Sequence, residues 1–316
     1  MPERNVPEKK PIVVVGSINM DLVATAEHIP APGETILGTD FQMHPGGKGA
    51  NQAVAAARLG VRENIQVQMI GQLGSDDIGK QLRAGLSKEG IDTTPIGTVP
   101  GPSGVALISV AASGENSIIV VPGANSQVTP AYLDQHSAYI RKAGLVLAQL
   151  EIPIETILHL ATLCEQASVP LILDPAPAQE LPAALFKQVA WFTPNETEAE
   201  FYLKQKKNPK PTDESAHALL AKGPSGVILK LGSKGAFLAS SKGSEISIKP
   251  FQVQAVDSTG AGDAFNGAFA AALTLGQSPL EASIFASAAA AISVTRPGAQ
   301  ASMATLEEVH QLLGDA

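Results

Sequence analysis

The feature that most constrains the fold is an alternation of short apolar runs with helix-type patterns along most of the chain. Continuous apolar strands separated by crossover helices are typical of a parallel sheet covered by helices on both faces. The sequence therefore predicts an α/β fold. Strands are expected at 11–17, 66–71, 145–149, 171–174, 191–193 and 227–231, and helices at 48–59, 76–88, 154–167, 196–203, 213–222, 263–275, 280–294 and 305–313.

Two segments, at about 20–45 and 97–122, interrupt this alternation. They combine period-two apolar patterns with turn residues such as Pro32 and Gly114, which is typical of antiparallel hairpins. We expect the two segments to form a small sheet that projects as a lid from a single domain spanning 1–316. Two ordinary surface hairpins are the alternative that the pattern leaves open.

Composition excludes several classes of partner. The 30 acidic residues outnumber the 22 basic ones, for a net charge of −8, so a nucleic-acid backbone would be repelled. No apolar run approaches the roughly 18 residues needed to span a bilayer, and residues 1–10 are polar and carry no targeting pattern. Cys164 is the single cysteine, which favours a reducing compartment. We therefore expect a cytoplasmic protein without nucleic-acid or membrane partners.

The strongest motif is Asp-Ser-Thr-Gly-Ala-Gly-Asp at 257–263, which leads into an Ala-rich helix. Its glycines allow a ligand to approach the backbone closely. The N–H groups at the start of the helix attract anions through hydrogen bonds and the helix dipole, so a phosphate would bind well there. Asp263 would act there as a base that accepts a proton, or as an ordinary N-cap, and the sequence leaves both open.

A second glycine-rich turn, Pro-Gly-Gly-Lys-Gly-Ala-Asn at 45–51, also enters a helix. Lys48 and Asn51 are three residues apart and share a helix face, while Asn19 and Asp21 lie on one side of an extended segment. Amides and carboxylates of this kind suit sugar hydroxyls, which both donate and accept hydrogen bonds. Asx-turns at a strand end are the alternative for Asn19 and Asp21.

Two phosphate-loop patterns are excluded. Residues 74–81 have nearly the Walker A spacing, but Gln81 replaces the hydroxyl residue that holds magnesium, and two aspartates would oppose an anion. The Gly-x-Gly-x-x-Gly pattern that starts at Gly260 has Phe265 at its last position, and it does not follow the first strand as a dinucleotide fold requires. A nicotinamide-dependent dehydrogenase is therefore not expected.

The order and content of these motifs resemble the phosphofructokinase B family of ribokinase-like sugar kinases. The resemblance covers about 12–312, with an opening strand at 16–21 and signatures at 46–53 and 257–263. It implies a ribokinase-like three-layer α/β sandwich with a mostly parallel central sheet and a small β-sheet lid. The implied reaction is ATP-dependent phosphorylation of D-ribose at O5, giving ribose 5-phosphate and ADP. A kinase of another small sugar, such as deoxyribose or fructose, and a non-catalytic sensor are the alternatives.

The resemblance also implies roles residue by residue. Asp263 would be the catalytic base, and the amides of Gly260, Ala261 and Gly262 would hold charge on the transferring group. Matches to the sugar contacts are Asn19, Asp21, Gly47, Lys48, Asn51, Ala106, Ile118, Glu151 and Asp263. Matches to the nucleotide site are Asn195, Lys230, Leu231, Gly232, Ser233, Lys234, Gly235, Gly262, Asp263 and Ser287. Asp257, Thr259, Ser293, Arg296, Gly298 and Ser302 match ligands of an activating potassium ion.

The chain departs from the family pattern at a few positions. Lys230 stands where Thr is common before the Leu-Gly pair, Ser258 replaces the more usual Thr, and Ser287 replaces a His of some relatives. Magnesium would arrive with ATP, held largely by phosphates and water, so no dedicated metal cluster is expected. Because exposed hairpins carry unpaired strand edges, and because the resemblance implies it, we expect a homodimer formed through the lid.

Overall fold

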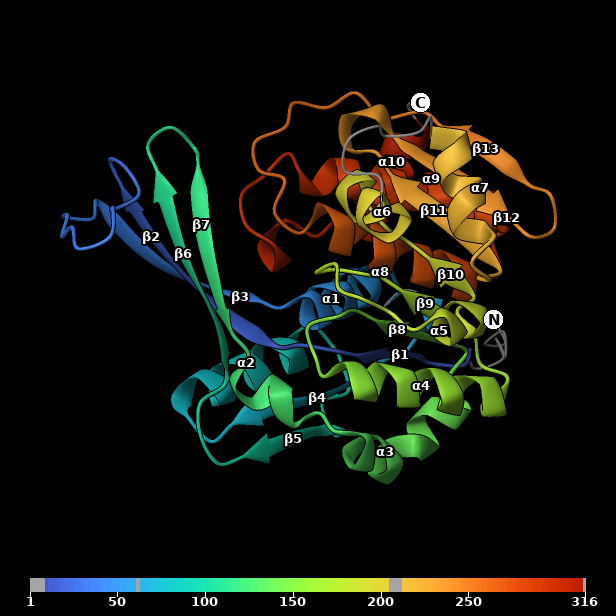
Figure 1. Cartoon of the computed structure of the whole chain (residues 1–316), viewed down its shortest axis with the longest axis horizontal. Coiled ribbons are helices and arrows are strands. Elements are labelled where there is room, and N and C mark those ends of the chain that lie inside the picture. The colour runs from blue at the N-terminus through green and yellow to red at the C-terminus, as the bar shows by residue number, and fades with distance from the viewer. Residues whose placement is uncertain (1–8, 61–62, 205–211, 315–316) are drawn as a thin grey trace, which may run out of the picture.

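The computed structural model describes residues 9–60, 63–204 and 212–314 and contains two sheets (Figure 1). The main sheet has the strand order β13-β12-β11-β10-β9-β8-β1-β4-β5, and the small sheet has the order β3-β2-β6-β7. The main strands are β1 (Ile12–Val15), β4 (Val67–Gly74), β5 (Ile96–Val99), β8 (Leu145–Ala148), β9 (Leu171–Leu173), β10 (Trp191–Phe192), β11 (Gly226–Lys230), β12 (Ala236–Ser240) and β13 (Glu245–Ile248).

The main sheet is parallel from β5 to β11, and β12 at the other side is reversed, pairing antiparallel with both β11 and β13. All six strands expected from the apolar runs are present. The sequence analysis missed β5 and the hairpin of β12 and β13, which are short or only partly buried. Because β5 pairs with β4, the strands of the small sheet begin later than the segment at about 97–122 suggests.

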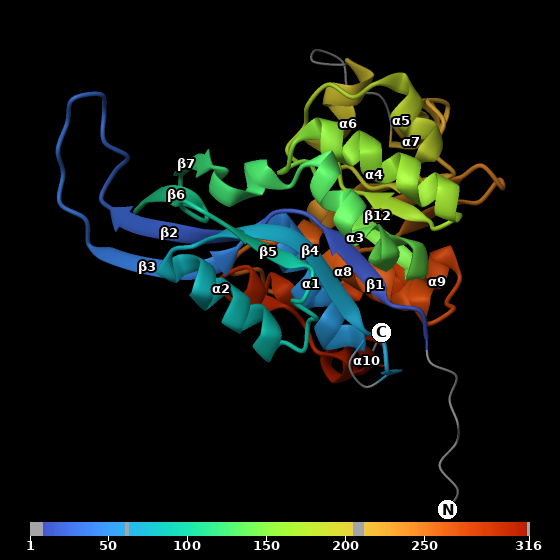
Figure 2. The same ribbon diagram turned by 90° about the horizontal axis from the view of Figure 1, so that it is seen from below.

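Helices cover both faces of the main sheet, which confirms the three-layer sandwich (Figures 1 and 2). The side chains of β1 alternate between the layers: Ile12 and Val14 join one core, and Val13 and Val15 the other. One layer contains α1 (Lys48–Gly60), α2 (Asp77–Lys88), α8 (Ala261–Thr274), α9 (Pro279–Ser293) and α10 (Leu306–Gly314); the other contains α3 (Pro130–Lys142), α4 (Ile154–Ala167), α5 (Ala183–Gln188), α6 (Glu196–Leu203) and α7 (Thr212–Leu220). In the described part of the chain, no helix has the length and apolarity needed to cross a membrane.

The small sheet projects from the body of the molecule (Figures 1 and 2). Its strands are β2 (Asn19–Ala26), β3 (Asp40–Gly46), β6 (Gly104–Ala111) and β7 (Asn116–Val121). The antiparallel pairs β2–β3 and β6–β7 are the expected hairpins, and a parallel pairing of β2 with β6 joins them. The two segments therefore form one sheet rather than separate hairpins.

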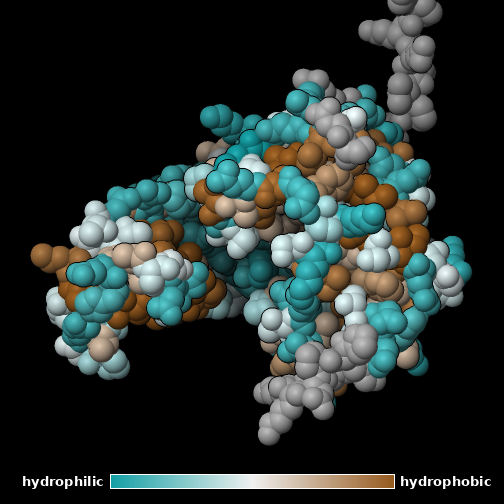
Figure 3. Space-filling model, turned by 90° about the horizontal axis from the view of Figure 1, so that it is seen from above, coloured by the Kyte–Doolittle hydropathy of each residue, from teal (hydrophilic) through white to brown (hydrophobic). Residues whose placement is uncertain are grey.

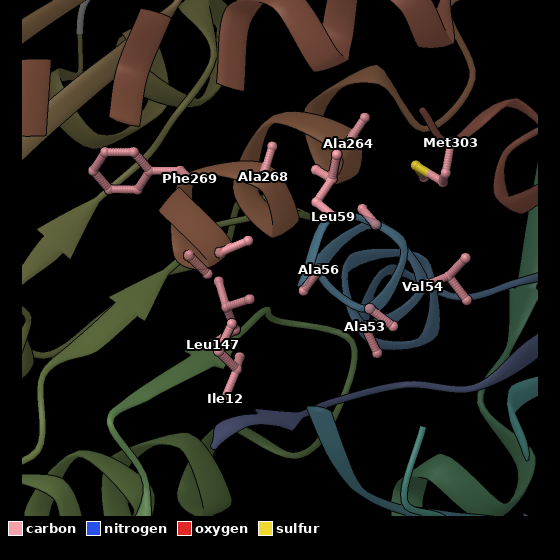
Figure 4. Close-up of a cluster of buried hydrophobic side chains, with 14 of the residues drawn as sticks. Ile12, Ala53, Val54, Ala56, Leu59, Leu147, Ala264, Ala268, Phe269 and Met303 are labelled. Carbon is pink, nitrogen blue, oxygen red and sulfur yellow. The ribbon is translucent and has the colours of Figure 1, made fainter. Parts of the chain in front are cut away.

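Helices α1 and α8 pack closely through small residues (Figure 4). A Cβ added at Gly267 of α8 would lie 2.6 Å from the Gln52 carbonyl oxygen of α1, so only glycine allows this approach. Ala53, Ala56, Ala264 and Ala268 belong to the same buried cluster. The packing brings the starts of the two helices together, which places both glycine-rich motifs at one site.

Candidate active site

Asp263 lies in the first turn of α8 and is 4% exposed. Asn51 Nδ2 donates to its Oδ2 at 2.9 Å, and Gln52 Nε2 donates to its Oδ1 at 3.0 Å. Burial, with the charge of Asp174, raises the pKa of Asp263 against the opposing effect of Lys48. The alternative role as an N-cap is wrong, because Gly260 occupies that position and the Asp263 carboxylate bonds to α1.

The start of α8 leaves backbone donors unused. Gly260 has φ +75°, which L side chains rarely adopt, and Ala261 N donates back to Ser258 O at 3.2 Å. The N–H groups of Gly262 and Asp263 have no acceptor within residues 9–60, 63–204 and 212–314. All four residues from Gly260 to Asp263 line a cavity of about 620 Å³. An anion in this cavity would meet both free N–H groups.

This cavity contains most of the residues that match the nucleotide site. Asn195, Lys230, Gly232, Ser233, Gly235 and Ser287 line it, together with Gly262 and Asp263. Leu231 and Lys234 do not: Leu231 joins the buried core, and Lys234 Nζ bonds to Glu196 at 2.9 Å on the surface. The sequence analysis did not single out the apolar lining, which includes Phe251, Val253, Ala255, Ala290, Ala291 and Val294.

Asp174 is a site residue that the sequence analysis missed. It is 1% exposed and follows β9 directly, at the carboxyl edge of the sheet where ligands bind in such folds. Its Oδ1 pairs with Lys230 Nζ at 2.8 Å, and its Oδ2 accepts from Gln52 Nε2 at 2.8 Å. Gln52 thus connects Asp174 to Asp263.

Lys230 stands directly in front of the start of α8. A Cβ at Gly262 would lie 3.4 Å from Lys230 Nζ, so the ammonium borders the free N–H groups. Burial raises the pKa of Glu198 above its usual value; the charge of Lys230 lowers it, and the charge of Asp174 raises it. The cavity therefore combines carboxylates with two amines, Lys48 and Lys230.

Several residues that match sugar contacts gather at the start of α1. Glu151 Oε2 accepts from Ser17 Oγ at 2.6 Å and from Lys48 N at 3.1 Å. Gly47 has φ +86°, and a Cβ there would lie 2.7 Å from Asn19 N. The charge of Asp263 above all keeps the pKa of Lys48 above its usual value. The Lys48 side chain is therefore a positively charged donor beside the carboxylates.

Asp21 faces this group from β2. Burial, with the charges of Glu151 and Asp263, raises its pKa to about 6. The register aligns Asp21 with Ala106, so Ala106 and Ile118 lie on the same face of the small sheet. Ala106 is buried and Ile118 is 53% exposed. Figure 3 shows hydrophilic residues in the recess between the projecting sheet and the body.

The residues that match potassium ligands lie on two loops joined by Asp257. Its Oδ1 accepts from Thr259 N and Oγ1 at 2.9 and 2.6 Å, and its Oδ2 accepts from Gly298 N at 2.8 Å. The Arg296 guanidinium pairs with Glu308 at 2.8 Å, which leaves its backbone carbonyl as the donor. Ser293 and Ser302 each donate their hydroxyl to a nearby carbonyl.

This donor set fits a large monovalent cation, because it consists of oxygens and carries a single carboxylate, from Asp257. Among the residues that the structure describes, no cluster of His, Cys, Asp or Glu could hold a metal ion by itself.

Comparison with known proteins gives consistent results. The family model described as pfkB family carbohydrate kinase matches residues 9–306. A ribokinase of Haemophilus influenzae is 44% identical over 98% of this chain and 100% of its own length, and a deoxyribokinase of Salmonella typhi is 36% identical over 96% and 98%. The structure of an Arabidopsis thaliana ribokinase complexed with ribose and ATP superposes with a TM-score of 0.89, at 35% identity, over 96% of this chain and 99% of that chain.

Proposed function

The chain belongs to the pfkB family of carbohydrate kinases, and we propose that it transfers the γ-phosphoryl group of ATP to O5 of D-ribose, giving ribose 5-phosphate and ADP. The observation that carries this proposal is the buried Asp263 carboxylate beside the two free N–H groups of α8. The site thus has a proton acceptor and an anion cradle side by side. The ribokinases at 44% identity support ribose as the acceptor.

In this reaction Asp263 accepts the proton of the O5 hydroxyl as the oxygen attacks the phosphorus. A positioned base of this kind contributes about 10²–10⁴-fold. The free N–H groups of Gly260, Gly262 and Asp263 stabilise the negative charge of the transferring group, whereas Ala261 N is engaged by Ser258 O and supports the turn. Because the transition state is loose, positioning and charge stabilisation supply most of the catalysis. The sugar is held by Asn19, Asp21, Gly47, Lys48, Asn51 and Glu151, with Ala106 and Ile118 as apolar contacts from the small sheet.

The nucleotide occupies the cavity of about 620 Å³. Its base lies against the apolar lining, and its phosphates face Lys230 and the start of α8. Asn195, Gly232, Ser233, Gly235 and Ser287 line the path between them, whereas Leu231 and Lys234 support the loop without lining the cavity. Magnesium bound to the phosphates would supply charge neutralisation, and the carboxylate of Glu198, which lines the cavity, would help to hold it.

We also propose that potassium activates the enzyme through the Asp257 loops. The site adjoins Gly260 in sequence, so an ordered cation there stabilises the turn that shapes the anion cradle. Exchange of potassium for sodium should lower kcat about tenfold and lower Tm. In Asp257→Asn, both responses should disappear. Equal kcat and Tm in the two salts for the unaltered enzyme would contradict this site.

The small sheet acts in this proposal as a lid on a single domain spanning 1–316. Its segments at about 20–45 and 97–122 lie beside the sugar residues, and closure excludes water from the reaction. Exposed apolar side chains and unpaired edge strands, β3 and β7, favour a homodimer formed through this sheet. The side chains concerned are Phe41, Leu107, Ile118, Ile119, Val120 and Val121.

Sedimentation velocity tests the dimer. We expect a dimer of the unaltered chain and a monomer of Ile119→Lys, because Ile119 is 62% exposed and a charge there would have to be desolvated. A monomeric unaltered chain would contradict the proposal.

The buried thiol of Cys164 suits a reducing compartment, and we place the enzyme in the cytoplasm.

The reaction itself is tested with purified protein, ATP, magnesium and potassium against ribose, 2-deoxyribose, fructose and adenosine. Ribose should give the highest kcat/KM, and ³¹P NMR should identify the 5-phosphate. A faster turnover of another sugar would favour the alternative kinase. Sugar binding without ADP formation would indicate a sensor.

A further inference from the structure

Asn125 is a fully buried amide that none of the roles above uses. It lies in the 3₁₀ turn η2 (Gly123–Gln127), which follows β7 at the base of the small sheet. Its Oδ1 accepts from Ile18 N at 2.9 Å, and its Nδ2 donates to Asn19 Oδ1 at 2.7 Å and to Ile18 O at 3.3 Å. Asn125 thus bonds to a sugar-site residue 106 positions away in sequence.

These contacts determine which way the Asn19 amide points. A backbone N–H only donates, so the atom of Asn125 that faces Ile18 N is its oxygen. The other atom, Nδ2, is a donor, and it therefore requires the oxygen of Asn19 as its acceptor. Asn19 Nδ2 must then point the other way, where it makes no hydrogen bond within the described ranges.

Close packing holds the two amides in these positions, so the rearrangement left to Asn19 is an exchange of its Oδ1 and Nδ2 by rotation of the amide group. A Cβ at Gly104 of β6 would collide with both Asn125 Nδ2 and Asn19 Oδ1. On the other side, a Cβ at Gly47 would lie 2.7 Å from Asn19 N. Asn19 itself is 3% exposed. A flipped Asn19 would bring two NH₂ groups face to face in this buried space, which loses the 2.7 Å bond and leaves Asn125 Nδ2 only its longer bond to Ile18 O.

Resting on the proposed sugar-kinase function, we propose that Asn125 is a positioning residue that makes Asn19 a hydrogen-bond donor toward one hydroxyl of the sugar. Asn51 presents the other atom of its amide to the site. Its Nδ2 is engaged by Asp263, and its buried Oδ1 has no partner and can accept. A hydroxyl that accepts from Asn19 keeps its own hydrogen for a carboxylate, and Asp21 lies two residues along the same side of β2.

The proposal has a consequence for selectivity. A site built to donate to a hydroxyl discriminates strongly against an analogue that lacks it, because the buried donor then stays unpaired. Discrimination at one hydroxyl should therefore depend on Asn125, although Asn125 does not touch the sugar. Discrimination at the other hydroxyls should not depend on it.

The test is Asn125→Asp, which keeps the shape and the acceptor for Ile18 N but removes the donor to Asn19 Oδ1. The Asn19 amide then turns its Nδ2 toward the introduced carboxylate, and an acceptor faces the sugar. We expect KM and the calorimetric Kd for ribose to rise 10–100-fold, with kcat and KM for ATP within threefold. Ribose, 1,4-anhydroribitol, 2-deoxyribose and 3-deoxyribose are compared as ligands.

In the unaltered enzyme, one of these deoxy analogues should bind at least tenfold more weakly because of Asn19. In Asn125→Asp the loss of affinity for that analogue relative to ribose should fall below threefold, while the losses for the other deoxy analogues remain. Ser103→Ala is the matched control. Ser103 is also fully buried at the base of β6 and bonds to Asp76 at 2.6 Å, so its loss loosens the sheet without touching Asn19. All sugars should be affected equally.

A uniform loss of affinity in Asn125→Asp, like that of Ser103→Ala, would overturn the proposal, as would unchanged discrimination. If Asn125→Asp does not fold, Asn125→Ala carries the same comparison with a smaller expected loss of 3–10-fold. Turnover of ribose by the unaltered enzyme is measured separately. Its absence refutes the proposed reaction, and the deoxy series is then applied to the sugar that is turned over.

Discussion

The starts of α1 and α8 are built from similar glycine-rich turns, but they differ in whether their backbone N–H groups are already hydrogen-bonded. Each follows a glycine with positive φ, Gly47 at +86° and Gly260 at +75°. At α1 the first N–H groups are already used: Lys48 N donates to Glu151 Oε2 at 3.1 Å, and Gly49 N donates to Ser17 Oγ at 3.4 Å. At α8 the N–H groups of Gly262 and Asp263 are free among the described residues.

The difference separates two functions of one local motif. The helix dipole attracts an anion at the N-terminus of each of these helices, but Glu151 already supplies that anion to α1 from within the chain. Helix α1 therefore contributes side chains, those of Lys48 and Asn51, to the site. Helix α8 contributes its backbone, which suits a phosphoryl group that comes and goes.

The largest expected effect that tests this division is that of Asp263→Asn. The amide cannot accept a proton, so kcat should fall about 10²–10⁴-fold, while calorimetric ribose affinity stays within a few-fold. Steady-state kinetics beside calorimetry separates the two effects. A variant with near-normal kcat would show that the chemistry does not depend on the first turn of α8.

A pair of glycine substitutions contrasts the two turns directly. In Gly262→Ala the methyl group enters the cavity near Lys230 Nζ, at 3.4 Å, so KM for ATP should rise about tenfold with little change in Tm. In Gly49→Ala the Cβ would lie 2.8 Å from the backbone of Gly16, and overpacking should cost about 1–3 kcal/mol of stability. Thermal melts and ATP titrations distinguish the two. The comparison fails if both substitutions act on stability alone.

A third prediction concerns the internal anion. Glu151→Gln removes the charge at the start of α1 and weakens the bonds from Ser17 and Lys48 N, so the free energy of unfolding should fall by about 1–2 kcal/mol. KM for ribose should rise, whereas KM for ATP should not. Urea unfolding measures the first effect. If KM for ATP rises instead, α1 also serves the phosphate.

The smallest effect concerns Asp21, whose pKa is raised to about 6, first by burial and then by Glu151 and Asp263. Folding disfavours its ionised form, so the cost to stability is complete above pH 6 and fades as the pH falls from 6 toward 4. A shift of roughly two pKa units corresponds to about 3 kcal/mol, and solvent screening of this partly exposed group reduces that value. Asp21→Asn should therefore stabilise the free enzyme by about 1 kcal/mol at pH 7.5 and leave its stability unchanged at pH 4.

The same carboxylate predicts how sugar binding depends on pH. Ribose affinity of the unaltered enzyme should decrease below pH 6, because protonation removes an acceptor for a hydroxyl. The Asp21→Asn variant should bind weakly and without this pH dependence. Calorimetric titrations from pH 5 to 8 provide the measurement. A flat profile in the unaltered enzyme would contradict the role given to Asp21.

The local patterns predicted the fold to the extent that local forces determine it. Apolar runs located β1, β4, β8, β9, β10 and β11, since burial on both faces requires such runs. The edge strand β5 and the hairpin of β12 and β13 have mixed burial and leave a weaker pattern. The parallel pairing of β2 with β6 depends on two segments distant in sequence, and neither hairpin encodes it by itself.

For the site, Asn51, Lys48 and Asp263 from the two motifs lie together in the structure, but the motifs did not reveal the residues behind them. Asp174 pairs with Lys230 because β9, β10 and β11 are neighbours in the sheet, which no local spacing shows. This pair also accounts for a lysine at a position where the family commonly has Thr. Asn125 was missed because its partners are more than 100 residues away.

The contact at Gly267 has a consequence for the size of acceptor that the enzyme can use. Because α8 touches α1 with no spare room, the two helices cannot move closer for a shorter sugar, and moving apart for a longer one would open voids in their buried cluster. The distance between the hydroxyl-binding groups on α1 and the phosphoryl-binding N–H groups on α8 is therefore constant. An acceptor whose reactive alcohol lies one carbon further along would miss the line of attack, whatever its affinity.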